Sequence, residues 1–343
     1  MPKGDITLKD IAKTVGKSVA AVSKALNDHQ DISLETREAI KQVAIEMGYR
    51  PNITAQRLQK KRTDTLGLVV PILSARQADP FFTELLAGVA DQAAILGYDL
   101  LVSTRKPGED EETAYQRLVY QQRVDGLIVA QPRKNDWRVS FLTEQTVPFV
   151  IVGHFNKTLN WPSVLINTEQ GISQAVEHLV SQGRQRIAVI PPPRELLVSD
   201  SYRQSFTRIT AQFAGLKSKI ATNIETASQK EGYRATLTLL NESDSPDGII
   251  TCHDLVGLGA MAAIQDQGFE VGNDIAVVGF GDILLAEHAQ PPLTTIHQPI
   301  YSMGQQACNI LTGLVEETQP LPLQQIVEPW LVVRQSSELA LWL

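Results

Sequence analysis

The chain has 343 residues, 43% of them hydrophobic and 20% charged, and a net charge of −7. This length exceeds one ordinary core, so we expect at least two domains, and the balanced composition excludes disordered, collagen-like and coiled-coil classes. The longest apolar runs, such as 66–73, are far shorter than the ~20 residues that cross a bilayer, and the first ten residues lack the apolar segment of a secretory signal. Cys252 and Cys308 form no C-x-x-C pair. We therefore predict a cytoplasmic protein with no membrane contact, disulfide framework or metal site.

The charge is divided unevenly along the chain. Residues 1–62 hold 12 Lys and Arg against 7 Asp and Glu, a net charge of +5, whereas the remainder carries a net charge of −12. Because nucleic acids attract proteins through their phosphate charges, a basic head on an acidic body predicts that only the head meets a polyanion.

Two short helices are expected in the basic head. Thr7 and Asp10 have the spacing of a capping box, and apolar residues then recur on one helical face up to Val15. Gly16 suits the left-handed turn that ends a helix, and Ser18 suits the cap of a second helix. Two helices joined by so short a turn form a helix-turn-helix.

A third helix, expected from Ser33 to about Gly48, completes the unit. In a helix-turn-helix the second helix lies in the major groove of DNA, with its N-terminal residues toward the base edges. The outward positions of that helix are Val19, Ala20 and Lys24. A lysine can donate to guanine or phosphate, and the two apolar side chains can meet a thymine methyl group.

Polar residues at the helix starts and turns are the candidates for contacts with the DNA backbone. They are Thr7, Lys17, Ser18, Asn27, Ser33, Thr36 and Arg37. The alternative is a plain three-helix packing unit that binds no DNA.

A very short basic helix is expected after Gly48. Pro51 suits its first turn, and Ala55 and Leu58, three residues apart, share one face. A helix this short is marginal in water, so it should order only against a partner. Its basic residues, four of them between positions 57 and 62, indicate that this partner is DNA.

From Leu66 onward, strand-length apolar runs alternate with helical patterns. The expected strands have the sequences TLGLVVPI, YDLLVS, GLIVA, PFVIVG, RIAVI, DGIITC and DIAVVGF, and the expected helices span about 85–96, 111–122, 136–145, 170–181, 228–240 and 255–267. This alternation predicts an α/β body of two doubly wound parallel-sheet lobes. Ligands bind such folds beyond the carboxyl ends of the strands, so we expect a cleft between the lobes.

Several side chains near the expected strand ends suit a ligand cleft. Asp79, Phe81 and Phe82 end the loop after the first strand, where aromatic faces can stack on a sugar ring or a purine base. Asp254 and Asp282 follow two later strands and can accept hydrogen bonds from hydroxyl groups. The alternatives are that Phe82 belongs to the lobe core and that Asp254 caps the helix that follows it.

The head resembles the DNA-binding headpiece and hinge of the LacI/GalR family of bacterial repressors. The similar segments are TLKDIAKTVGKSVAAVSKALN and SLETREAIKQVAIEMGYRPNITAQRL. The resemblance implies base-reading roles for the three outward residues of the second helix and DNA contacts for the hinge residues Asn52, Ala55 and Leu58. Leu58 would be a wedge that enters the minor groove between two base steps.

The resemblance continues through DPFFTELLAGV, VDGLIV, SYRQSF, CHDLVGLGAM, DIAVVGFGD and PPLTTIHQP. It implies a body similar to periplasmic sugar-binding proteins, in which the chain crosses between the lobes several times. Lobe one would comprise residues 65–166 and 296–326, and lobe two residues 167–295 and 327–343. The resemblance also implies that Arg203 binds an effector and that His154 and Gln298 contact it; an internal partner for Arg203 is the alternative.

The sequence departs from the family pattern at four positions. Lys17 and Ala21 stand where members often carry Val and Thr, which leaves the operator sequence open. His253 replaces the usual Asn, and Gly281 replaces the usual acidic residue. An amide and a carboxylate that often hold sugar hydroxyls are therefore missing, which leaves the identity of the effector open.

Together these features predict a helix-turn-helix headpiece (1–50), a hinge (51–64) and a two-lobed body (65–343). We expect a sequence-specific transcriptional regulator that represses metabolic, in particular carbohydrate-utilisation, genes. It would bind a pseudo-palindromic operator in double-stranded DNA as a homodimer, and a sugar or related metabolite would switch its operator affinity. The alternative is a solute-binding receptor that uses the body alone.

Catalysis and a cofactor are not expected. The sequence has no G-x-S-x-G and no H-E-x-x-H, and residues 279–281 lack the third glycine of a dinucleotide-binding loop. The pair His253 and Asp254 would suit a metal-dependent hydrolase only with further ligands nearby, and the six histidines are scattered along the chain.

Overall fold

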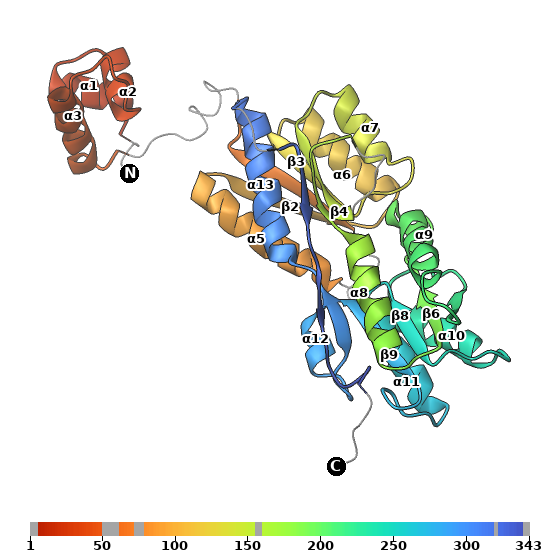
Figure 1. The fold of residues 1–343 in the computed structure, drawn as a ribbon. Helices are drawn as coiled ribbons and strands as arrows, with labels where there is room; N and C mark the ends of the chain where they lie inside the picture. Colours follow the sequence, from red (N-terminus) through yellow and green to blue (C-terminus); the bar gives the residue numbers. More distant parts are fainter. Residues whose placement is uncertain (1–5, 50–61, 72–78, 155–159, 319–321, 339–343) are drawn as a thin grey trace. The chain divides into compact units, whose positions relative to one another are not determined.

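The computed structural model describes residues 6–49, 62–71, 79–154, 160–318 and 322–338. The chain divides into two compact units, Met1–Arg62 and Thr63–Leu343, each with its own apolar core (Figure 1). Within the described part, no helix has the length and apolar character needed to span a membrane.

The first unit is the predicted helix-turn-helix with a supporting helix. It consists of α1 (Leu8–Val15), α2 (Val19–Leu26) and α3 (Leu34–Glu46). The side chains of Ile11, Val22, Ala25 and Ile40 are at most 1% exposed and form its centre. Because each helix contributes to this small core, none of the three would be stable alone.

The local signals in the sequence are used as predicted. The Asp10 carboxylate accepts hydrogen bonds from the backbone N–H (2.9 Å) and the hydroxyl (2.7 Å) of Thr7. Gly16 has a φ of 64°, which lets α1 end in a left-handed turn. Ser18 caps α2 by accepting from the backbone N–H of Ala21 at 3.1 Å.

Lobe one of the second unit is built on a six-stranded sheet in the order β11-β5-β4-β3-β1-β2, with all neighbours parallel. The strands are β1 (Thr65–Pro71), β2 (Asp99–Arg105), β3 (Gly126–Ala130), β4 (Phe149–His154), β5 (Ser163–Ile166) and β11 (Gln324–Val327). Helices α5 (Pro80–Leu96) and α13 (Ile300–Glu316) pack in one core with Leu68, Ile128 and Val150. Helices α6 (Glu109–Tyr120) and α7 (Trp137–Glu144) pack in the other core with Val69 and Leu127. Successive residues of a strand, such as Leu68 and Val69, face the two cores in turn, so helices cover both faces of the sheet and the lobe is doubly wound.

Lobe two repeats this plan in the order β12-β10-β9-β8-β6-β7. Its strands are β6 (Arg186–Ile190), β7 (Lys217–Ile220), β8 (Gly248–Thr251), β9 (Ala276–Gly281), β10 (Thr294–His297) and β12 (Trp330–Val332). Helices α8 (Thr168–Ser181) and α9 (Val198–Thr210) pack with Ile187 and Val278 in the same apolar core that contains α5 and α13 of lobe one. Helices α10 (Gln229–Leu240) and α11 (Asp254–Asp266) share a separate core with Ile249 and Val277. The short α12 (Leu284–Glu287) follows β9.

The sheet of lobe two is parallel, as predicted, except for one strand at its edge. β12 pairs antiparallel with β10, because the chain returns from β11 in lobe one directly into the edge of the other sheet. The described chain passes between the lobes from β5 to α8, from β10 to α13 and from β11 to β12. The expectation of several crossings is confirmed.

In each lobe two helices cross so closely that only glycine fits at the contact. A Cβ atom added to Gly88 of α5 would lie 2.0 Å from the carbonyl oxygen of Tyr301 in α13. A Cβ atom added to Gly259 of α11 would lie 2.0 Å from the carbonyl oxygen of Gln229 in α10. Backbone therefore rests on backbone at both crossings.

Candidate functional site

The first candidate site is the outward surface of α2 in the headpiece. Val19, Ala20 and Lys24 are all exposed, with Val19 at 39%, although an apolar side chain is normally better buried. Among the predicted backbone-contacting residues, Thr7, Lys17, Ser18, Asn27 and Ser33 are exposed and Thr36 and Arg37 are half-buried. The predicted hinge contacts Asn52, Ala55 and Leu58 lie outside the described residues.

Several of these polar residues also have structural roles in the headpiece. The Asn27 side-chain amide donates to the Ser23 carbonyl at 2.8 Å, and Ser33 caps α3 by accepting from the backbone N–H of Thr36 at 3.4 Å. Arg37 donates to the Asp28 carbonyl at 3.2 Å. These bonds fix the turns around α2, so the surface is preorganised in the absence of DNA.

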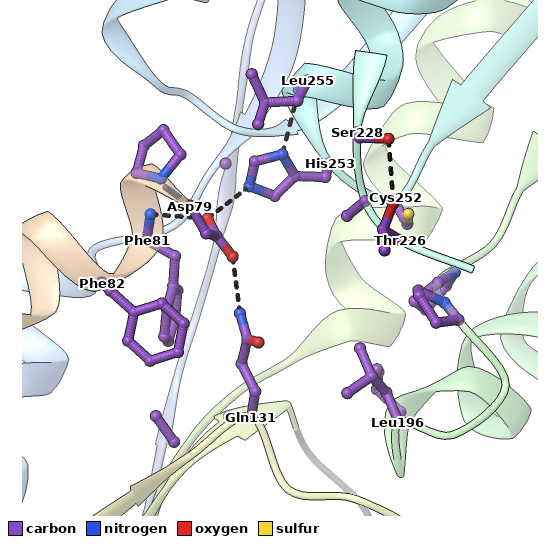
Figure 2. Close-up of a pocket in the computed structure, with 18 of the residues that line it drawn as sticks. Asp79, Phe81, Phe82, Gln131, Leu196, Thr226, Ser228, Cys252, His253 and Leu255 are labelled. Carbon is purple, nitrogen blue, oxygen red and sulfur yellow. Dashed lines mark hydrogen bonds and ion pairs between the residues drawn. The ribbon is translucent and has the colours of Figure 1, made fainter. Parts of the chain in front are cut away.

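The second candidate site is a cavity of about 590 Å³ between the two lobes. Its walls come from loops at the ends of strands and the starts of helices, as expected for a doubly wound fold. Lobe one contributes Asp79, Phe81, Phe82, Gln131, Gly153 and His154, and lobe two contributes Leu196, Tyr202, Thr226, Ser228, Cys252 and His253, with Gln298 at a crossover (Figure 2). A volume of this size suits a small metabolite.

Asp79 and His253 meet across this cavity. Asp79 caps α5 by accepting from the backbone N–H of Phe81 (3.0 Å), and its other oxygen accepts from the Gln131 amide (3.0 Å). The Nε2 atom of His253 lies 3.2 Å from the Asp79 carboxylate, while its Nδ1 atom accepts from the backbone N–H of Leu255 and so caps α11 (Figure 2). With Nδ1 as an acceptor, the ring proton is on Nε2 and faces Asp79.

The surroundings keep the Asp79 carboxyl ionised. Its burial would raise the pKa, but the close contact with the His253 ring N–H and the hydrogen bonds from Gln131 and the Phe81 backbone hold the pKa below the ordinary value. Asp79 is thus a charged group at a lobe boundary, held by partners from both lobes.

A second contact between the lobes lies beside the cavity. The Leu197 N–H donates to the Pro132 carbonyl at 2.9 Å, and the Lys134 N–H donates to the Glu195 carbonyl at 2.8 Å. The Lys134 ammonium also pairs with Asp200 at 2.6 Å. These bonds form a short antiparallel ladder between residues 132–134 of lobe one and 195–197 of lobe two.

A buried ionic network holds the lobe-one side of this ladder in place. The Arg138 guanidinium, 1% exposed, pairs with Asp136 and donates to the carbonyls of Ala130 and Gln131. Arg133 makes two bonds, of 2.8 and 3.1 Å, to the fully buried Glu111 carboxylate. Paired buried charges of this kind fix a loop well, because breaking one pair leaves a charge without compensation.

Five of the eight residues predicted to contact a ligand line the cavity: Asp79, Phe81, Phe82, His154 and Gln298. Phe82 lines the cavity and is also part of the lobe core, so its core role is confirmed and its contact with a ligand stays a prediction. The His154 ring bonds to the Thr168 hydroxyl at 2.8 Å, and burial lowers its pKa to about 4, so this ring is neutral near pH 7. Gln298 is 6% exposed.

The other three predicted residues do not line the cavity. Asp254 is fully buried and accepts from the Thr295 hydroxyl (2.5 Å) and the Ile283 N–H (2.8 Å). The alternative that Asp254 caps α11 is also wrong, because the neighbouring His253 is the cap. Asp282 pairs instead with His297 (2.8 Å) and Arg334 (2.7 Å). Arg203 has an internal partner, as the alternative held: its guanidinium donates to the Asn223 side-chain oxygen Oδ1 at 2.6 Å.

Sequence reasoning missed several lining residues. Gln131 follows β3 directly, so the rule that ligands bind beyond strand ends could have found it. Pro192 and Pro193 likewise follow β6. Thr226 and Ser228 precede α10 and carry no signal beyond the helix cap that Ser228 provides.

Comparison with known proteins identifies both units of the chain. Residues 7–52 match the model of the bacterial regulatory proteins of the lacI family, and residues 176–337 match a periplasmic binding protein-like domain. The HTH-type transcriptional regulator AglR of Rhizobium meliloti (strain 1021) is 30% identical over 97% of this chain and 94% of its own length.

Two solved structures extend the likeness to the fold. The lac repressor dimer bound to operator and the anti-inducer ONPF is 28% identical, with a TM-score of 0.80 over 97% of this chain and 99% of that one. The complex of the transcriptional regulator CelR with cellobiose is 29% identical, with a TM-score of 0.72 over 96% and 99%.

The headpiece, the two-lobed body and its cavity thus define a DNA-binding transcriptional regulator with a sensor domain. The chain belongs to the lacI family of bacterial regulatory proteins.

Proposed function

We propose that this regulator represses metabolic genes, in particular genes of carbohydrate utilisation, and that a small molecule bound between its lobes switches its operator affinity. It would act in the cytoplasm as a homodimer on a pseudo-palindromic operator, and it would catalyse no reaction. The single observation that carries the effector part is the cavity walled by both lobes, because a ligand that contacts both walls stabilises one arrangement of the lobes over others.

The energetic requirement for such a switch is modest. An effector must bind the two states of the protein with different affinities, and a coupling of about 1 to 3 kcal/mol changes operator affinity roughly five- to 150-fold. The contacts that hold the lobes together, Asp79 with His253 and Lys134 with Asp200, are the groups whose geometry an effector would change.

The chemistry of the cavity supports an uncharged, hydroxyl-bearing effector. The rings of Phe81 and Phe82 pack edge to face with centroids 5.2 Å apart and offer an apolar wall for a sugar ring. The neutral His154, the buried Gln298 and the hydroxyl of Ser228 can exchange hydrogen bonds with hydroxyl groups. The cellobiose complex of the relative CelR favours the same class.

A thermal-shift screen of the whole protein tests the effector. The ligands would be mono- and disaccharides, nucleosides and phosphorylated metabolites, and a true ligand raises the unfolding temperature with concentration. We expect a carbohydrate to stabilise the wild type and to stabilise Gln298→Ala less. No stabilisation by any carbohydrate would contradict the effector class.

The solute-receptor alternative makes a different prediction for DNA. A sequence-specific regulator should bind a duplex enriched by in vitro selection more tightly than random DNA, with an affinity that falls steeply as salt rises. A receptor should bind neither duplex. Addition of the stabilising sugar to the protein–DNA complex then shows whether the ligand weakens or tightens operator binding.

A further inference from the structure

The basic charge of the N-terminal unit is not located on its three helices. Residues 6–49 contain six Lys and Arg and six Asp and Glu, so their net charge is zero. The five positive charges in excess over residues 1–62 all fall within residues 50–62, which hold five basic residues and no acidic one. The three helices and their turns therefore carry no net charge.

Two of the six acidic residues lie between α2 and α3 and pair with basic side chains of these helices. Asp31 forms an ion pair with the Lys24 ammonium, and both side chains are about half exposed, at 50% and 49%. Asp28 pairs with the Lys41 ammonium at 2.6 Å and lies 3.8 Å from the Arg37 guanidinium. The hydrogen bonds from Lys41 and Lys24 hold the pKa values of Asp28 and Asp31 below the ordinary value, so both are ionised at neutral pH.

We propose that Asp28 and Asp31 are specificity-determining residues that act as internal substitutes for DNA phosphate. In the free headpiece they form ion pairs with Lys24, Arg37 and Lys41, three cations of α2 and α3. A phosphate of random-sequence DNA must compete with a carboxylate for each of these cations. The inference rests on DNA binding by the headpiece and goes beyond it, because it assigns a role to two acidic residues.

The two carboxylates act differently on a correct and on a random site. A lysine ammonium has three N–H donors, so Lys24 can keep one bond to Asp31 and still present two donors to acceptors on a base edge. On a correct site Asp31 is thus a positioning residue for Lys24. On random DNA, where binding is almost wholly electrostatic, the same carboxylate only competes with phosphate.

Salt dependence gives the proposal a second readout. Each additional phosphate neutralised by a cation steepens the fall of log K with log salt by about 0.9. If neutral side chains at positions 28 and 31 release Lys24, Arg37 and Lys41 for phosphate contacts, the slope on random DNA should steepen by about one to three such steps.

The experiment uses the whole protein and the nearly isosteric variants Asp28→Asn, Asp31→Asn and their combination. Glu46→Gln is the matched control, since it removes one negative charge from the same unit and its carboxylate accepts only from the Gln42 amide in the described structure. Affinity would be measured by fluorescence anisotropy on a random-sequence duplex and on a duplex selected in vitro with the wild type. Thermal unfolding would confirm that each variant folds.

The double variant should bind the random duplex about tenfold more tightly than the wild type, with a steeper salt dependence, and the selected duplex with less than about threefold change. Glu46→Gln should change both affinities little. Lys24→Gln combined with Asp31→Asn should lose the gain made by Asp31→Asn alone, because its target cation is gone.

Two outcomes would overturn the proposal: an equal gain on both duplexes, which is a general charge effect, or a double variant that behaves like Glu46→Gln. Failure of the wild type to bind any duplex would instead contradict DNA binding itself, so the two failures can be told apart.

Discussion

Asp79 and His253 each cap a helix of a different lobe, and the same two side chains lie 3.2 Å apart across the cavity. The start of α5 and the start of α11 are thereby joined through one carboxylate and one imidazole. A ligand that enters between these two groups breaks their hydrogen bond and must offer a donor to Asp79 and an acceptor to His253.

Replacing Asp79 by Ala should destabilise the body by about 2 to 3 kcal/mol. The change removes a helix cap, worth about 1 kcal/mol, and leaves the His253 N–H and the Gln131 amide without their acceptor. Urea unfolding measures the loss. Hydrogen exchange at the Leu197 amide, which bonds across the lobes, should become faster.

Ser228→Ala is the control for this effect. Ser228 caps α10 by accepting from the backbone N–H of Glu231 at 3.4 Å and bonds to the Thr226 hydroxyl at 3.1 Å, so both of its bonds lie within lobe two. Its loss should cost about 1 kcal/mol without a change in exchange at Leu197. Equal exchange at Leu197 in Asp79→Ala and wild type would show that the Asp79–His253 contact does not hold the lobes together.

The buried His154 should make stability depend on pH. Its pKa of about 4 in the folded protein lies below the ordinary value of 6.5, because burial disfavours the charged ring. As pH falls, the unfolded state therefore takes up the proton first, so the stabilisation is complete above pH 6.5 and is lost between 6.5 and 4. The loss approaches about 3 kcal/mol at the lower limit.

His154→Gln should flatten this part of the pH profile, since an amide can still bond to the Thr168 hydroxyl but does not titrate. The exposed His288 provides the control, and His288→Gln should leave the profile unchanged. The measurement is the free energy of unfolding in urea at intervals between pH 4 and 7. An unaltered profile in His154→Gln would contradict this assignment.

Gly259→Ala should destabilise lobe two more than an ordinary helical substitution. On an open helix the change would stabilise by up to about 1 kcal/mol. Here the new methyl group would lie 2.0 Å from the Gln229 carbonyl oxygen, so α10 and α11 must separate. We expect a net loss of about 2 kcal/mol or more.

Gly268→Ala is the control with no steric contact. A Cβ atom added to Gly268 would have no atom within 4 Å, but the residue has a φ of 81°. Its cost should come from the backbone alone, about 1 kcal/mol. Thermal unfolding compares the two variants. A loss no larger in Gly259→Ala than in Gly268→Ala would show that the close crossing of α10 and α11 does not limit stability.

The headpiece shows how far local signals reach. Thr7, Ser18 and Ser33 stand at helix starts, and the helices begin where these caps predict. Such signals act over three or four residues, so the sequence contains them directly. The same holds for the doubly wound body, whose buried strands read as continuous apolar runs.

The elements that were missed depend on distant partners. β10 and β11 are each four residues long and become strands only through neighbours in the sheets. Helix α13 begins in an ambiguous apolar stretch and is defined by its packing on α5. Pattern reasoning has no access to such long-range pairing.

The candidate site also contains residues placed by local signals and residues placed by distant partners. The Asp79 cap could be predicted, because its position after a strand and before a helix is local. The capture of Asp282 by Arg334, 52 residues later, could not, nor could the pairing of Arg203 with Asn223. Its position after a strand predicted that Asp282 lies near the ligand, and the family resemblance predicted the same of Arg203. Their side chains bond to distant residues instead, and these bonds cannot be predicted from the sequence pattern.

The two glycine crossings have a mechanical consequence for the body. Helices that touch through backbone atoms at Gly88 and Gly259 cannot slide past each other without a clash, so each lobe is expected to move as a rigid plate. The described chain connects the two lobes through the short segments 166–168, 297–300 and 327–330. A ligand in the cavity that rotates one lobe relative to the other would bend these three connectors. Their stiffness would therefore limit the size of the rotation.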